Sequence, residues 1–180
     1  MKEFAMPHEP EYYVADILHA AGGRLVSRIR LQKIAYLLDQ LGAESGFDYS
    51  YHHYGPYSRD LDSAILDAEA FDLVDEQYGY RISDGARYSI FVHKSADKEY
   101  TSLSNKYLRD ITKKLASQNV TVLELAATAH WLAEVERVDD WEAEIRRRKG
   151  SKTDNGRLEE ATKLLADVGL PPAASVGVCR

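Results

Sequence analysis

Cysteine is almost absent from this chain of 180 residues, which contains only Cys179, next to the C-terminus. One thiol cannot form an internal disulfide, so the composition favours a reducing compartment, and we predict a cytoplasmic protein. Cys179 follows the segment Pro171–Ser175, which offers no rigid scaffold. We therefore predict that residues 171–180 form a disordered tail and that the thiol is not a nucleophile.

Long hydrophobic runs are also missing. No stretch approaches the roughly 20 apolar residues that are needed to span a bilayer. The first residues lack the apolar core of a signal peptide as well. The sequence therefore predicts no membrane partner.

The chain has no excess of basic residues, and its formal net charge is -6. Residues 1–95 contain 9 basic and 15 acidic residues, whereas the remainder contains 14 of each. Nucleic-acid affinity depends on clustered Lys and Arg, so this distribution disfavours broad phosphate binding. It leaves room for a small local basic face.

Recognisable catalytic and metal-binding motifs are missing too. The six histidines lack short ligand spacings, and His52 and His53 should point to opposite faces of a predicted strand. We expect His130 to be a hydrogen-bonded structural histidine, because no nucleophile motif accompanies it. No glycine-rich phosphate loop is present. The sequence therefore predicts a protein that is not an enzyme and has no cofactor and no metal site.

The periodicity of the apolar residues predicts a mostly helical protein. Alternation predicts strands near 47–52, 78–82 and 87–92, whereas three-four spacing predicts helices near 9–21, 27–41, 102–116 and 155–168, with further helices after Ser58, Thr121 and Asp139. We predict an α+β fold, predominantly α-helical, in one domain of residues 1–170. It comprises a winged-helix-like N-terminal part (9–95) with a small antiparallel sheet, and a helical part (97–170).

Local signals set several boundaries in this prediction. Pro56 cannot donate to a strand ladder and should end the first strand, after which Ser58 should cap a new helix. Asp84-Gly85 lies between alternating runs and predicts a hairpin. The sequence Thr121-Val122-Leu123-Glu124 has the pattern of a capping box. In the helix that begins near 27, Gln32 and Lys33 should lie opposite the apolar face.

A basic run, Arg146–Lys149, ends one of the predicted helices. Cations favour the negative C-terminal end of a helix, and acidic residues at 139–144 suit its start, so charge complementation is the leading interpretation. Phosphate binding by this run is the alternative.

Tyrosines gather around the predicted break between strand and helix. Tyrosine combines apolar area with a polar tip, and tyrosine and arginine are frequent in protein interfaces. We therefore predict a partner-binding surface made by Tyr49, Tyr51, Tyr54, Tyr57 and Arg59. The alternative is that these rings form one half-buried face of the small sheet.

Three segments together resemble a known family. They are Arg30-Leu31-Gln32-Lys33-Ile34-Ala35-Tyr36-Leu37, His53-Tyr54-Gly55-Pro56-Tyr57-Ser58, and Thr121 to His130 with its Leu-Glu-Leu and Thr-x-His pattern. This combination resembles the SocA-like, or Panacea-domain, antitoxin group, and within it the uncharacterised YwgA-like branch. The resemblance covers about residues 15–170. It implies a mostly helical domain that binds and neutralises a toxin, or acts in conflict with mobile elements or phages.

Three functions remain open from the sequence. The first is an antitoxin-like module that binds a protein. The second is a winged-helix DNA-binding regulator, whose contact face would be Arg24, Arg28, Arg30 and Lys33. The acidic residues of the helix after Ser58 disfavour this second function, because a DNA-reading helix needs basic residues. The third is an enzyme without a familiar motif.

Overall fold

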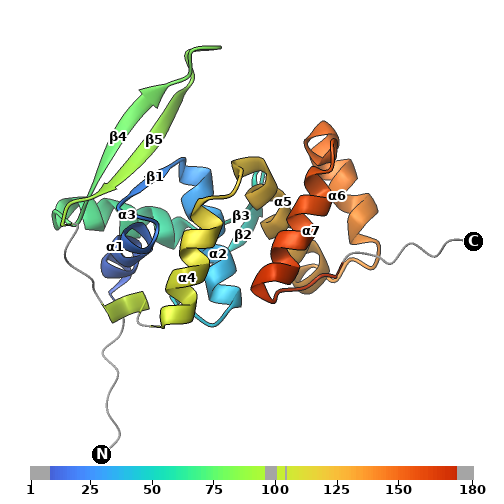
Figure 1. Cartoon of the computed structure of the whole chain (residues 1–180), viewed down its shortest axis with the longest axis horizontal. Coiled ribbons are helices and arrows are strands. Elements are labelled where there is room, and N and C mark those ends of the chain that lie inside the picture. Colours follow the sequence, from blue (N-terminus) through green and yellow to red (C-terminus); the bar gives the residue numbers. More distant parts are fainter. Residues whose placement is uncertain (1–8, 96–100, 104, 174–180) are drawn as a thin grey trace, which may run out of the picture.

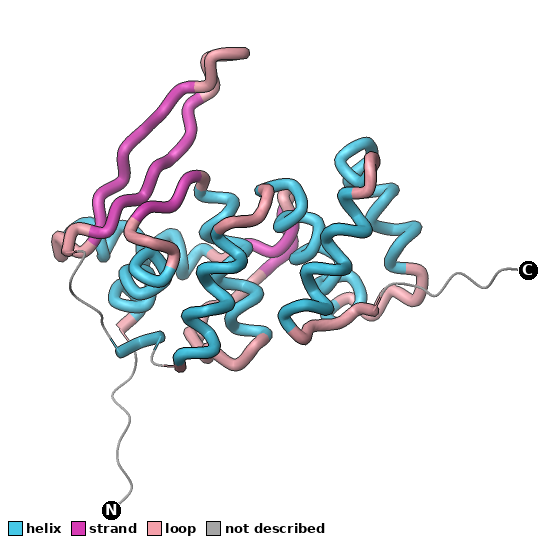
Figure 2. Tube along the Cα trace, in the orientation of Figure 1, coloured by secondary structure: helices cyan, strands magenta, loops and turns pink. Residues whose placement is uncertain are grey.

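The computed structural model describes residues 9–95, 101–103 and 105–173. Figures 1 and 2 show helices and two small sheets up to residue 93, followed by a part in which the described residues form helices and loops. The α-helices are α1 (Pro10–Ala20), α2 (Arg28–Gln40), α3 (Arg59–Ala70), α4 (Lys106–Ala116), α5 (Val120–His130), α6 (Trp141–Lys149) and α7 (Arg157–Val168), and the strands are β1 (Arg24–Val26), β2 (Ser50–His52), β3 (Gly55–Tyr57), β4 (Val74–Tyr80) and β5 (Arg87–His93). The predicted α+β, predominantly helical fold is confirmed.

The N-terminal part has the winged-helix arrangement that the sequence predicted. The three helices α1, α2 and α3 are followed by the β4–β5 hairpin, which pairs with β1 in an antiparallel sheet of order β1-β5-β4. The Asp84-Gly85 turn at the end of this hairpin is the one expected from the sequence. Figure 1 shows the hairpin extending well beyond the helices, and we call it the wing.

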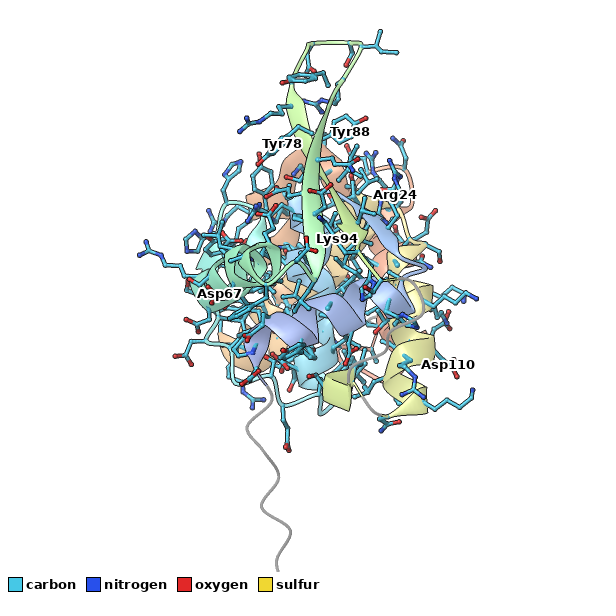
Figure 3. The ribbon with its side chains drawn as sticks, turned by 90° about the vertical axis from the view of Figure 1, so that its left-hand side faces the viewer. Arg24, Asp67, Tyr78, Tyr88, Lys94 and Asp110 are labelled. Atoms are coloured by element: carbon cyan, nitrogen blue, oxygen red, sulfur yellow. The ribbon has the colours of Figure 1, made fainter. Side chains whose placement is uncertain are left out.

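The two faces of the wing follow the alternation of its strands. Tyr78 pairs with Ser89 in the register, so Tyr88 lies on the opposite face. Figure 3 shows Tyr78 and Tyr88 on either side of the hairpin. Tyr78, Tyr80 and Ile82 are all exposed. The outer half of the wing therefore projects aromatic and aliphatic side chains into solvent.

Helix α2 lies at the centre of the molecule, and its middle part is buried. Its buried residues form an unbroken run from Leu31 to Leu38. It packs against α4 and α5, and β3 lies across its remaining side. The expectation that Gln32 and Lys33 face outwards is therefore wrong, because the small β2–β3 sheet covers the polar side of the helix.

The helical C-terminal part packs on α2 through α5. Every residue of α5 from Val122 to His130 is buried. Helix α7 packs along α5, and α6 contacts α5 through its inner face. Figure 1 shows this part as one end of an elongated molecule, with the wing at the other end.

Some predicted boundaries are confirmed and others are wrong. Ser58 caps α3 through its side chain, as expected, and Asp140 caps α6 in the same way. Pro56 does not end the strand region but lies within β3, opposite Tyr51. The cap of α5 is Asn119, two residues before Thr121, so the predicted capping box does not form.

Other differences concern short or peripheral segments. Strand β1, only three residues long, was not predicted. The described residues end at position 173, so most of the predicted tail at 171–180, including Cys179, lies outside them. Within the described ranges, none of the helices combines the length and the apolar character that a membrane crossing requires.

Candidate functional site

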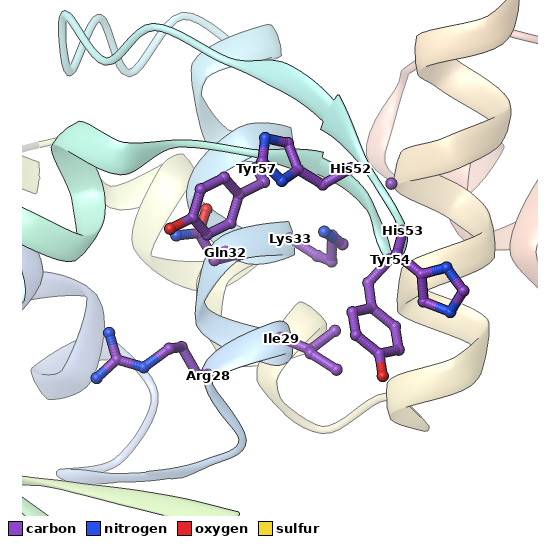
Figure 4. Close-up of a pocket in the computed structure, with 9 residues that line it drawn as sticks. Arg28, Ile29, Gln32, Lys33, His52, His53, Tyr54 and Tyr57 are labelled. Carbon is purple, nitrogen blue, oxygen red and sulfur yellow. The ribbon is translucent and has the colours of Figure 1, made fainter.

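A pocket of about 350 Å³ opens between α2 and the β2–β3 turn. Its walls are largely aromatic and apolar, and Figure 4 shows how the side chains surround it. The residues that line it are Arg28, Ile29, Gln32, Lys33, His52, His53, Tyr54, Gly55 and Tyr57. Six of them, Gln32, Lys33, His53, Tyr54, Gly55 and Tyr57, belong to two of the three segments that carry the family resemblance.

Lys33 is the central polar group of this pocket. Its side chain extends from α2 between Tyr57 and Tyr54, and the residue is only 2% exposed. The ammonium donates a hydrogen bond to the carbonyl oxygen of Pro56. Burial lowers the pKa of Lys33 from 10.5 to about 7, although the negative charge of Glu124 acts in the opposite direction. The amine therefore changes its charge close to neutral pH.

Gln32 fixes the turn from β3 into α3. Its amide nitrogen donates to the carbonyl oxygen of Ser58 at 2.8 Å, and its amide oxygen accepts from the Ser58 backbone N–H at 2.8 Å. The same nitrogen lies 3.1 Å from a carboxylate oxygen of Asp62. One buried side chain thus satisfies both backbone groups of the residue that caps α3.

Gly55 allows the β2–β3 hairpin to approach α5 closely. Its φ is +89°, which favours glycine, and a Cβ at this position would lie 2.5 Å from Oγ1 of Thr128. Thr128 in turn donates its hydroxyl proton to the Glu124 carbonyl oxygen within α5. The Gly-Pro pair and the Thr-x-His pattern are therefore in direct contact.

A buried carboxylate lies beneath the same hairpin. Glu124 is ion-paired with Lys149 at 2.9 Å, and both side chains are nearly inaccessible, at 5% and 3% exposure. Lys152, which is 40% exposed, binds the same carboxylate at 3.0 Å. Lys149 also donates to the carbonyl oxygen of His53 at 3.0 Å, which ties α6 to the β2–β3 turn.

This cluster was not predicted from the sequence. Glu124 was assigned to a capping box, and Lys149 to a basic run that complements the C-terminal end of a helix. The signal that could have revealed it is the single acid within the apolar stretch Val122–Ala129, because such a residue needs a buried partner. Its partners come from positions 25 and 28 residues later, and no local pattern identifies them.

His130 forms the hydrogen bond that was expected of it. Its Nδ1 lies 2.8 Å from the hydroxyl oxygen of Tyr36, and both residues are buried. Burial lowers the pKa of His130 and raises that of Tyr36. Both effects favour the neutral forms of the pair.

The three segments that carry the resemblance therefore meet in one place. Lys33 is hydrogen-bonded to Pro56, Gly55 packs closely against Thr128, and Tyr36 is hydrogen-bonded to His130. Residues far apart in the sequence thus build one continuous junction of α2, α5 and the β2–β3 hairpin. We call it the motif junction, and the pocket is its open side.

The predicted partner-binding residues differ in how they are placed. Tyr49 is packed against Tyr36, and its hydroxyl donates to Asp39. Tyr51 is half-buried beneath Arg148, whose guanidinium lies 4.7 Å from the ring centre. These two rings are mainly part of the internal packing. The structure does not bring them together with the three others on one free surface.

The remaining three lie at or near the surface. Tyr54 is 45% exposed, and Arg59 is exposed at the start of α3. Tyr57 is partly exposed, and its hydroxyl donates to Asp62. Tyr54 and Tyr57 also line the pocket.

The four residues of the alternative DNA-binding face do not form a common surface. Arg24 is exposed, but Lys33 is buried. Arg28 is ion-paired with Asp62 at 3.0 Å and with Glu76 at 2.7 Å. Arg30 donates to three backbone carbonyl groups, those of Val26, Ala116 and Gln118.

The basic run at the end of α6 is engaged in ion pairs. Arg147 and Arg148 both bind Glu144 at 2.6 Å, and Arg148 also binds Glu136 at 2.6 Å. Arg146 is near Glu159 at 3.5 Å, and Lys149 is the buried partner of Glu124. This geometry matches charge complementation and leaves little free positive charge for phosphate.

In the described ranges, no three side chains of His, Cys, Asp or Glu gather in a way that could hold a metal ion. No protein-family model matches the chain, and no curated protein matches it. The resemblance to the SocA-like group thus remains a prediction that rests on the three motifs.

Proposed function

We propose that the protein is a non-catalytic, antitoxin-like module that binds a partner protein, such as a toxin. The observation that carries this proposal is the outer face of α3. This helix occupies the position from which a winged-helix protein reads DNA. Most residues exposed on this face are acidic or apolar, namely Asp60, Leu66, Asp67 and the C-cap residue Phe71. Ser63 and Arg59 are exposed as well, and Arg59 is the only basic residue of the helix.

Such a face suits a protein better than a duplex. Leu66 is 61% exposed and Phe71 is 63% exposed, so the face presents two large apolar side chains to solvent. Apolar groups surrounded by charge are typical of protein interaction sites. The carboxylates would repel DNA phosphates but would complement a basic partner. The partner surface that fits is therefore apolar with a basic rim.

The aromatic residues at the strand-helix break extend this candidate surface. Arg59 is the first residue of α3, and Tyr57 precedes it by two positions. Tyrosine and arginine often carry a large part of the binding energy of an interface. We therefore assign the partner contact to Tyr54, Tyr57 and Arg59 together with Leu66 and Phe71.

Affinity purification from the native host tests this proposal. The bait carries either Leu66→Ser and Phe71→Ser or Tyr57→Ala and Arg59→Ala, and circular dichroism verifies that each variant is folded. The control is Tyr107→Ala, which removes a ring that is 50% exposed from α4. We expect both double variants to lose a partner that the wild type and the control retain. Retention of every wild-type partner by both would refute the assignment.

A winged-helix DNA-binding regulator is the second candidate, because the topology and the exposed Arg81 and Arg87 of the wing favour it. Arg81 is paired with Asp84, however, and Arg87 lies over the ring of Tyr78. We expect no tight binding to the upstream region of the gene in a mobility-shift titration at about 0.15 M salt. Nanomolar affinity that is lost in Arg24→Ala and Arg87→Ala would favour the regulator instead.

A further inference from the structure

The pocket at the motif junction has a size and a lining that suit a small ligand. Its volume of about 350 Å³ lies in the range of ligand pockets, which begins at roughly 300 Å³. Ile29 and the rings of Tyr54 and Tyr57 supply apolar and aromatic walls. Figure 4 shows the side chain of Lys33 between these rings. A ligand here would have an apolar, flat body and would meet one amine.

The amine of Lys33 has donors to spare. An ammonium carries three N–H donors, and the acceptor that Lys33 reaches in the described ranges is the carbonyl oxygen of Pro56. The residue is only 2% exposed, but it forms part of the pocket wall. A ligand held against this wall could offer the amine a further hydrogen-bond acceptor.

The charges around Lys33 favour the binding of an anion. Three lysines, Lys33, Lys149 and Lys152, surround the single carboxylate of Glu124, which is already ion-paired with Lys149 and Lys152. The Glu124 carboxylate attracts the charged form of Lys33 without forming an ion pair with it, whereas the ammonium groups of Lys149 and Lys152 repel Lys33. A carboxylate in the pocket would give Lys33 its own counter-charge.

We propose that the pocket binds a carboxylate attached to an aromatic or apolar group, with the carboxylate on Nζ of Lys33 and the apolar body between Tyr54 and Tyr57. This chemistry has two sources: a free aromatic acid, or the terminal carboxylate of a protein chain. Tyr54 and Tyr57 belong both to the pocket and to the proposed partner surface, whereas Lys33 belongs to the pocket alone. The site therefore stands whether or not that surface is confirmed.

Binding of this kind is coupled to protonation. The carboxylate favours the charged amine, so the complex forms best below the pKa of Lys33, which is about 7. The charged fraction falls about tenfold between pH 6 and pH 8, and the affinity should fall by about the same factor. The carboxylate itself stays ionised over this range. His52, His53 and Arg28 also line the pocket, and Glu124, Lys149 and Lys152 lie behind Lys33. The histidines need a separate control.

The experiment is a titration with benzoate followed by two-dimensional amide NMR, with benzamide as the uncharged isostere. Wild-type protein is compared with Lys33→Met, which removes the charge, and with Ile29→Trp, which fills the pocket but retains Lys33. The double variant His52→Gln, His53→Gln controls for histidine protonation. A peptide with a C-terminal phenylalanine carboxylate, and its amide, represent the protein source.

We expect benzoate to shift the amide signals of His53, Tyr54 and Gly55 and to bind about tenfold more weakly at pH 8 than at pH 6. Benzamide should bind weakly at both values. The pH dependence should persist in the histidine double variant and disappear in Lys33→Met, and Ile29→Trp should not bind. Tighter binding of the peptide acid than of benzoate would identify a chain terminus as the source. Equal benzoate affinity in wild type and Lys33→Met, or no binding of either acid at pH 6, would overturn the proposal.

Discussion

The two hairpins of this protein achieve their shapes by opposite means. The β2–β3 hairpin has strands of three residues and is held from outside, by Lys149 at its turn, by Lys33 at Pro56 and by Gln32 at its exit. The wing has strands of seven residues and protrudes from the body. Its contacts near the tip are internal ones, such as the ion pair between Arg81 and Asp84.

The difference shows where the stability of each hairpin originates. A short two-stranded ribbon is not stable by itself, so tertiary contacts must impose the conformation of β2–β3. The wing carries a longer ladder, and its outer half has few neighbours. We therefore expect substitutions at β2–β3 to lower the stability of the whole domain. Equivalent substitutions in the outer wing should have small, local effects.

The largest effect is expected from Glu124→Gln. It leaves Lys149 buried without a counter-charge beneath the β2–β3 turn, and the free energy of unfolding should fall by about 4 kcal/mol. The matched change in the wing is Asp84→Asn, which removes an exposed ion pair and should cost less than about 0.5 kcal/mol. Urea denaturation monitored by circular dichroism measures both. Similar losses for the two variants would contradict the contrast between the hairpins.

The second-largest loss of stability is expected from Gly55→Ala. The new methyl group adopts an unfavourable φ and collides with Thr128, and we expect a loss of about 3 kcal/mol. Gly85 in the wing turn also has a positive φ, +68°, but no heavy atom lies within 4 Å of the position that a Cβ would occupy there. Gly85→Ala should therefore cost only about 1 kcal/mol. The same denaturation experiment tests the pair, and equal losses would exclude a role for the contact with Thr128.

The pH dependence of stability should reveal Lys33. Its pKa falls from 10.5 to about 7 on folding, so the unfolded chain binds more protons between these values. Stability therefore rises with pH in this window, by about 2 kcal/mol between pH 7 and pH 9 from this group. Lys33→Met should lose this rise, whereas the exposed Lys113→Met should retain it. Parallel stability profiles for wild type and Lys33→Met would show that the amine is not perturbed.

The smallest effect is expected for Ser58→Ala, at the exit of the β2–β3 hairpin. The hydroxyl accepts from the backbone N–H of Leu61 at 3.3 Å, and its loss should reduce stability by about 1 kcal/mol. Ser63→Ala, at an exposed position of the same helix, should change stability by less than about 0.5 kcal/mol. An unchanged midpoint of thermal unfolding in Ser58→Ala would argue that Gln32 alone holds this turn.

The same contrast explains which parts of the fold the sequence could predict. The wing turn follows from Asp84-Gly85, and the start of α3 follows from Ser58, because both depend on neighbours within a few residues. The place of Pro56 within β3 could not be predicted in this way. Its missing N–H is tolerated in a short two-stranded sheet, and its carbonyl oxygen is satisfied by Lys33 from another helix.

The candidate site was only partly accessible for a related reason. Tyr54 and Tyr57 were singled out, and both line the pocket. Lys33 was placed on the solvent side, because helical periodicity gives a face but not what covers it. Glu124 and its lysines were missed because the pairing joins α5 to α6 and to the segment after it. Contacts of this kind depend on tertiary packing, which a local pattern does not encode.

Arg28 makes the wing and the pocket parts of one mechanical linkage. Its guanidinium binds Asp62 on α3 and Glu76 on β4, while the same residue lines the pocket. Each strand of the wing has seven residues, and the ion pair of Arg28 with Glu76 lies near the base of the wing. A movement of the wing that shifts Glu76 must therefore either displace Arg28 or break the ion pair between these two residues. A partner that binds the tip of the wing and moves it would therefore change the position of Arg28 in the pocket wall without contacting the pocket.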